Sequence, residues 1–193
     1  MKGTPVYRHV HLITKSLCLG FVGLSCLVLA AQQPTELVYQ LSFPAPQHRW
    51  LEVNVEFSDL IDGPLHVRMS SASPGRYARH EFSKNIIDIS FTGVGDSSVT
   101  VQQRGVGHWE IKDHGGAVHV QYRIFGDRVD GTYLGVDSTH AHLNLPATLV
   151  WAEGLESRAV RLTLTPPPDA IDWNVATQLF PTTDPLILSL IHI

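Results

Sequence analysis

Much of the chain alternates hydrophobic and polar residues with a period of two. The segment 51–57 reads LEVNVEF and the segment 118–124 reads VHVQYRI, so every second residue is apolar. Successive side chains of an extended strand point to opposite faces, so this alternation indicates strands with one buried face. The segments that we predict to be strands are 37–43, 51–57, 65–69, 86–91, 99–103, 108–112, 118–124, 149–152 and 160–164.

Glycine and proline mark the ends of these segments. Residues 113–116 (DHGG) predict a hairpin turn between 108–112 and 118–124, because glycine accepts the positive φ of such turns. The two GVG segments, 93–95 and 105–107, are expected to be turns, since neither opens a helix as a phosphate-binding loop does. A short turn within 78–85 is the only helix expected, and the prolines at 166–168 end the last clear strand.

The pattern therefore predicts an all-β fold. We expect an antiparallel β-sandwich or barrel-like domain of about nine short strands, after an N-terminal signal helix. The leader has the layout of a secretory signal peptide: Lys2, Arg8 and Lys15 precede the apolar run 16–30, and a cut after Ala30 fits. This run of 15 residues is shorter than the roughly 20 of a membrane-spanning helix.

We predict that residues 1–30 are removed on export to the periplasm or the cell exterior, which leaves no membrane span. A retained anchor is the alternative. A lipoprotein would have to use Cys26, and Gly23 fits the preceding motif poorly. Cys18 and Cys26 both lie in the leader, so the mature domain is expected to hold together without disulfides, thiolate zinc sites or a cysteine nucleophile.

Composition and charge narrow the function classes. The chain has 193 residues, of which 44% are hydrophobic and 17% are charged, which suits a folded domain rather than a disordered tail. The net charge is −4, and it becomes −7 once the three basic residues of the leader are removed. An acidic domain without a basic patch is not expected to bind nucleic acid or an anionic membrane surface.

Several residue groups have the composition of a reactive site but the wrong pattern. Residues 80–84 (HEFSK) nearly match the zinc-peptidase motif His-Glu-x-x-His, but Lys84 replaces the second imidazole, so a surface turn is the better interpretation. His140 and His142, with Asp137 nearby, give three imaginable metal ligands without a fourth, so we expect a hydrogen-bonded loop.

Other side chains also have simple structural interpretations. Asp127 and Asp130 bracket Arg128 in a segment expected to be a solvated loop, and the chain contains no Gly-x-Ser-x-Gly nucleophile elbow. The tryptophans form either a sugar-stacking platform or separate packing contacts, and packing is the commoner role; they are Trp50, Trp109, Trp151 and Trp173.

The most distinctive stretch is 70–86 (SSASPGRYARHEFSKNI). It resembles the N-terminal domain of the glycyl-aminopeptidase-like zinc metallopeptidases, which carry Ser-Pro-Gly-x-Tyr, then an Arg-(Asp/Glu)-Phe-like stretch and an Asn-Val/Ile pair. Here His80 stands between Arg79 and Glu81, and Ala72 replaces the usual tryptophan. Further similar segments follow in the family's order: 122–125 (YRIF), 137–146 (DSTHAHLNLP) and 171–177 (IDWNVAT).

The resemblance, which spans about 39–186, implies a β domain that precedes a thermolysin-like catalytic domain. In that family a His-Glu-x-x-His helix and a further glutamate hold zinc, and the enzymes remove N-terminal residues such as glycine and alanine. No position of this chain matches a zinc ligand or a catalytic residue, so we expect no metal and no catalytic residues here. The partners implied are the catalytic domain of the parent protein and its peptide substrates.

The last six residues, 188–193 (LSLIHI), match the in-frame translation of a common sequencing-adapter end. We therefore expect residues 31–187 to be the N-terminal β domain of a longer metallopeptidase and residues 188–193 to be a non-native tail. The alternatives are a free-standing exported β-sandwich that binds glycan or peptide, and a small metalloenzyme that uses His140, His142 and Asp137.

Within the predicted domain, the polar loop 73–81 is the candidate substrate-facing segment, since loops carry function. We expect Ser73, Tyr77, Arg79 and Glu81 to face the catalytic cleft of the parent, with Arg79 or Glu81 in contact with the peptide and Glu81 near its amine. The alternative is that Pro74, Gly75 and Tyr77 only fix a tight corner.

Overall fold

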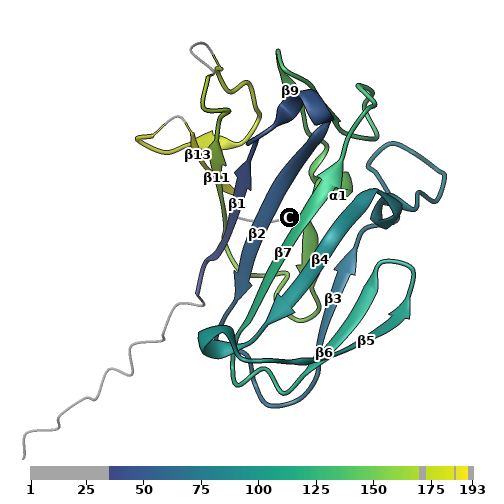
Figure 1. Cartoon of the computed structure of the whole chain (residues 1–193), viewed down its shortest axis with the longest axis vertical. Helices are drawn as coiled ribbons and strands as arrows, with labels where there is room; N and C mark the ends of the chain where they lie inside the picture. Colours follow the sequence, from purple (N-terminus) through teal and green to yellow (C-terminus); the bar gives the residue numbers. More distant parts are fainter. Residues whose placement is uncertain (1–34, 170–172, 185, 191–193) are drawn as a thin grey trace, which may run out of the picture. The chain divides into compact units, whose positions relative to one another are not determined.

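The alternating segments form two β-sheets in a computed structural model that describes residues 35–169, 173–184 and 186–190. The predicted signal peptide lies outside these residues. The larger sheet has the order β12-β13-β11-β1-β2-β7-β4, and Figure 1 shows β1, β2, β7 and β4 side by side. Its strands are β1 (Leu37–Ser42), β2 (Trp50–Phe57), β4 (Ile86–Thr92), β7 (Val118–Phe125), β11 (Val160–Thr165), β12 (Phe180–Pro181) and β13 (Ile187–Leu190).

The smaller sheet has the order β10-β3-β6-β5, and a further two-stranded pair joins β8 to β9. The helical elements are single turns. The remaining bounds are β3 (Leu65–Met69), β5 (Thr100–Gly105), β6 (His108–Lys112), β8 (Gly135–Val136), β9 (Ala141–His142), β10 (Val150–Ala152), α1 (Leu145–Thr148), and the 3-10 turns η1 (Pro46–His48), η2 (Phe82–Asn85) and η3 (Val94–Asp96).

The core lies between the inner faces of the two sheets. Every second residue of β1, β2, β3 and β7 is buried, as the alternation predicts. Two buried tyrosines of the larger sheet reach β10 of the smaller one: Tyr39 Oη donates to the Val150 carbonyl (2.8 Å), and Tyr122 Oη donates to the Thr148 carbonyl (2.7 Å) and accepts from the Val150 N–H (3.1 Å). These bonds satisfy backbone groups of Val150, in the edge strand β10, and of Thr148, at the end of α1.

The all-β fold and the nine predicted strands are confirmed, with ends that shift by a residue or two. The expected helical turn is η2, but the prediction that it is the only one is wrong, since α1, η1 and η3 are further single turns. The GVG segments are turns before β5 and between β5 and β6. The pairing is antiparallel except between β1 and β11, which run parallel with Leu37 opposite Val160. Among the described residues, no helix has the length and apolar character needed to cross a membrane.

The predicted hairpin at 113–116 is wrong. The turn exists, and Asp113, Gly115 and Gly116 have the positive φ values that it requires. However, β6 pairs with β3 and β5 in the smaller sheet, whereas β7 pairs with β2 and β4 in the larger one. The segment is therefore an arch between sheets, because both strands bury an apolar face and these faces belong to opposite sides of one core.

Residues near the end of the sequence form β13, antiparallel to β11, with Leu188 buried. An alternating Leu-Ser-Leu segment has the pattern of a half-buried strand whatever its origin. That residues 188–193 are non-native stays a prediction, and residues 191–193 lie outside the described part of the chain.

Candidate functional site

The loop between β3 and η2, residues 70–81, contains all four predicted site residues and starts with a tight turn. The Arg76 N–H donates to the Ser73 carbonyl (3.1 Å), and Gly75 has a φ of +76°. Pro74 and Gly75 thus occupy the positions that a type II turn reserves for proline and for a residue with positive φ. The His80 N–H closes the base of the 70–81 loop on the Ser71 carbonyl (2.8 Å).

The side-chain amide of Asn144, which lies between β9 and α1, links the 70–81 loop to the segment that precedes β8. Asn144, just before α1, donates from Nδ2 to Ser73 Oγ (3.0 Å) and to the Thr132 carbonyl. Ser73 is buried, so its hydroxyl serves this attachment and does not face solvent. Two later segments of the sequence therefore meet the 70–81 loop here: the 127–136 segment and the start of α1.

A cluster of three rings packs beneath the 70–81 loop. Phe82 is fully buried, and the His80 ring stacks on it with centroids 5.2 Å apart and an interplanar angle of 8°. The Tyr133 ring meets both edge-on, and its hydroxyl lies 3.2 Å from His80 Nδ1. His80 Nε2 is buried and has no hydrogen-bond partner among the described residues. The expected surface turn at 80–84 is thus anchored in the core by Phe82.

Two hollows open on either side of His80 and Tyr133, which line both. The first, of about 460 Å³, is also bordered by Arg79, Glu81 and Lys84. The second, of about 600 Å³, is bordered by Arg76, Tyr77, Arg128 and Asp130. Both hollows place charged groups of either sign around an aromatic centre.

The predicted residues differ in where they lie. The structure brings Tyr77, Arg79 and Glu81 to the rims of the two hollows, and all three are exposed; Tyr77 is fully exposed at 108% of its reference area. Ser73 lies beneath them, bonded to Asn144. The sequence reasoning missed Tyr133 and Asn144, and the second of these lies in the DSTHAHLNLP segment that carried the family resemblance.

The second hollow is bordered by the 70–81 loop and by the segment 128–133, which carries the charged residues Arg128 and Asp130. Asp130 accepts from the Tyr133 and Thr132 N–H groups (2.9 and 2.7 Å), and these two bonds, in that order, lower the pKa of its carboxyl. The Arg128 guanidinium lies 4.4 Å from the centroid of the Tyr133 ring. Charged groups of both signs around exposed loop residues suit the binding of a charged or peptide-like group.

The loop of Asp137, His140 and His142 is held together by hydrogen bonds. Asp137 Oδ1 accepts from the Thr139 hydroxyl (2.6 Å), the Thr139 N–H (2.7 Å) and the His140 N–H (3.0 Å), and the hydroxyl contributes most to lowering the pKa of Asp137 to about 2. His142 Nε2 contacts the Asp130 carbonyl instead (3.0 Å). Within the described ranges, no group of three or more His, Cys, Asp or Glu side chains is placed to hold a metal.

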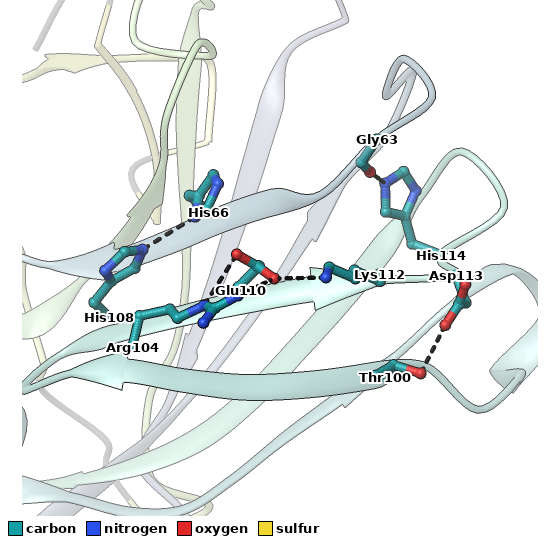
Figure 2. A network of polar contacts seen from close by, with 9 residues as sticks. All are labelled: Gly63, His66, Thr100, Arg104, His108, Glu110, Lys112, Asp113 and His114. Atoms are coloured by element: carbon teal, nitrogen blue, oxygen red, sulfur yellow. Dashed lines mark hydrogen bonds and ion pairs between the residues drawn. The ribbon is translucent and has the colours of Figure 1, made fainter.

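A second polar network, on the outer face of the smaller sheet, was also missed (Figure 2). Glu110 is largely buried between Arg104, which donates two hydrogen bonds (3.1 and 2.9 Å), and Lys112 (3.0 Å); these bonds, first that of Arg104, lower the pKa of Glu110 to about 2. His66 and His108 lie side by side in the same view. Glu110 and Lys112 share a strand face in the sequence, but no sequence signal pairs histidines 42 residues apart.

The four tryptophans do not form a common platform. Trp109 is buried and packs on Phe91, while Trp173 packs on Phe43 at a centroid distance of 5.2 Å. Trp50, on β2, lies under the guanidinium of Arg123, whereas Trp151 lies on β10. These two half-buried rings therefore belong to different sheets. Separate packing contacts are therefore the observed arrangement.

The comparisons with known proteins agree with the resemblance in the sequence. A family model described as the Peptidase M61 N-terminal domain matches residues 38–186. No curated protein sequence matches the chain. The solved structures that match include an aminopeptidase N family protein from Idiomarina loihiensis, with 21% identity and a TM-score of 0.73, and an M1 zinc metallopeptidase from Deinococcus radiodurans, with 10% identity and a TM-score of 0.36.

These likenesses cover most of this chain but a small part of the others. The match to the Idiomarina protein covers 81% of this chain and 27% of that one, and the match to the Deinococcus protein covers 83% and 39%. The Idiomarina structure supports the fold. The family model spans well over half of the chain. The chain therefore belongs to the family of peptidase M61 N-terminal domains.

Proposed function

We propose that this chain forms the non-catalytic N-terminal domain of an exported zinc-dependent aminopeptidase and flanks the catalytic cleft of the full-length protein. The observation that carries the proposal is the match of a peptidase N-terminal domain family to residues 38–186. The signal-like leader supports export. Zinc and the catalytic residues are assigned to another domain of the parent protein.

The residues of this chain do not fit the catalytic zinc. The HEFSK segment at 80–84 has Lys84 in place of the second imidazole, and η2 is a 3-10 turn rather than the helix on which that motif places its ligands. Phe82 is also fully buried within the segment. The domain therefore contributes to substrate access and not to water activation.

Within this role, the 70–81 loop faces the substrate. Its base is fixed by the Ser73–Asn144 bond and by the ring stack under His80, while Tyr77, Arg79 and Glu81 project from it. A rigid base with exposed tips holds a binding residue in position at a low entropic cost. In this arrangement, the Glu81 carboxylate accepts hydrogen bonds from the N-terminal ammonium group of the peptide substrate, and Arg79 lies along the substrate backbone.

The first test is long-read sequencing of the source DNA through codon 187 and beyond. Continuation of the reading frame into a His-Glu-x-x-His segment with a downstream glutamate supports the proposal. A genuine stop codon after codon 193 in unfragmented DNA contradicts it and favours a free-standing binding module.

The second test measures peptide hydrolysis by the full-length enzyme. The double variant Arg79→Ala/Glu81→Ala is expected to lower kcat/KM, because both charges lie at the rim of the first hollow. The matched control is Arg161→Ala/Glu36→Ala, which also removes one surface arginine and one surface glutamate; these two residues form an ion pair (2.5 Å) and line neither hollow. An unchanged kcat/KM for the first variant, or an equal loss in the control, rejects the cleft-facing role of the loop.

A further inference from the structure

Two imidazoles meet on the outer face of the smaller sheet. His66 on β3 and His108 on β6 lie diagonally across an antiparallel pair, since His66 is opposite Glu110 and His108 is opposite Arg68. Their neighbours Val67 and Trp109 are buried in the core, so both histidines point outward. His66 Nδ1 and His108 Nε2 are 3.1 Å apart, and the ring planes are tilted by 49° (Figure 2).

We propose that His66 and His108 form a two-histidine binding site for a divalent transition-metal ion, with Cu²⁺ bound most tightly. Imidazole nitrogen coordinates such ions at about 2.0–2.1 Å. An ion at that distance from both nitrogens, given their separation of 3.1 Å, subtends an angle of about 100°. This angle lies between a right angle and the tetrahedral angle, so both square-planar and tetrahedral ions fit.

The sheet holds the two ligands in place before any ion binds. β3 and β6 are central neighbours, and the strand ends are fixed by the bond from the Met69 N–H to the Gly107 carbonyl (2.8 Å). On the other side of β3, the Glu153 N–H donates to the His66 carbonyl (3.0 Å). Rotation of two rings is then the main adjustment that binding needs, which keeps the entropic cost low.

The nearby cations are each paired with a carboxylate. Arg68 pairs with Glu153, while Arg104 and Lys112 share Glu110. These two carboxylates neutralise most of the positive charge around the histidines, and the net charge of the surrounding groups stays positive. Across the ranges that the structure describes, no third His, Cys, Asp or Glu completes the set, so water fills the remaining positions.

This ligand set determines which ions are expected. Imidazole ligands suit zinc, copper and nickel, and affinity for divalent ions rises along the series to Cu²⁺ and falls again at Zn²⁺. Mg²⁺ and Ca²⁺ prefer oxygen ligands and are expected to be ignored. The inference does not depend on the peptidase role of the parent protein.

The test is a titration of the full chain with Cu²⁺ at neutral pH, followed by calorimetry and electron paramagnetic resonance. We expect one site per chain whose dissociation constant rises at least tenfold in His66→Gln and in His108→Gln. The spectrum is expected to show two coordinated ring nitrogens in the wild type and one in each variant. The matched control, His140→Gln/His142→Gln, is expected to bind as the wild type does.

A second measurement guards against variants that fail to fold. Titration of the wild-type chain with Zn²⁺, which is diamagnetic, is expected to shift the ring ¹⁵N resonances of His66 and His108 and not those of His140 and His142. The proposal is overturned if the wild type binds no Cu²⁺, if the His66 and His108 variants bind it unchanged, or if the zinc-dependent shifts occur at other histidines.

Discussion

Removal of one buried hydroxyl, in Tyr122→Phe, is expected to weaken the junction between the two sheets. Tyr122 is fully buried, and its Oη both donates to the Thr148 carbonyl and accepts from the Val150 N–H. Phenylalanine keeps the ring and its packing but leaves two backbone groups without this partner. Each such group costs about 1–3 kcal/mol, so we expect a loss of about 2–6 kcal/mol in the free energy of unfolding.

Tyr39→Phe provides the internal comparison. Tyr39 Oη makes a single bond, to the Val150 carbonyl, so its removal is expected to cost about 1–3 kcal/mol, half of the loss in Tyr122→Phe. Tyr77→Phe is the exposed control, and its effect is expected to stay within about 0.5 kcal/mol because the side chain is fully exposed.

The assay is urea unfolding at 25 °C followed by tryptophan fluorescence. The three variants should differ in midpoint and share one m-value, since a lost hydroxyl does not change the surface exposed on unfolding. A Tyr122→Phe variant as stable as the wild type, or less destabilised than Tyr39→Phe, refutes the idea that these phenols satisfy the backbone groups of Thr148 and Val150.

Three further predictions concern backbone space and pH. Gly126→Ala places a Cβ 2.7 Å from Leu134 Cδ1 and 3.0 Å from the Leu134 carbonyl oxygen, so it should lower the free energy of unfolding, measured in urea, by about 1–3 kcal/mol. Gly131→Ala, which places its Cβ in open space, should leave that free energy unchanged, and equal effects of the two substitutions would contradict this reasoning. Burial raises the pKa of Tyr39 and Tyr122 above the ordinary 10.0, so their contribution to stability is fully present below pH 10 and is lost as the pH rises beyond it. Between about pH 9 and 11.5, the double variant Tyr39→Phe/Tyr122→Phe should therefore lose less stability with rising pH than the wild type does. The lowered pKa of Asp137 means that its loop contacts are fully formed above the ordinary value of 3.8 and lost as pH falls through about 2; carboxyl NMR shifts should titrate there, and Asp137→Ala should speed hydrogen exchange of the His140 amide.

The candidate site was predictable only in part. The Ser-Pro-Gly sequence specifies a type II turn locally, so the corner at 73–76 follows from residue types alone. The exposure of Tyr77, Arg79 and Glu81 also follows from their polarity and from the loop position. Ser73 differs, because its burial depends on Asn144, which is 71 residues away. Tyr133 joins the site for the same reason, through contacts that no local pattern encodes.

The sequence by itself determined the strands, their buried faces, the tight turns and the family. Alternation is a local property, because a period of two assigns each side chain to one face of its own strand. Only the tertiary structure decided which strands are neighbours, so that residues 113–116 cross between sheets and β1 pairs in parallel with β11. It also brought His66 to His108. Such pairings depend on how apolar faces from distant segments close one core, and that is a long-range choice.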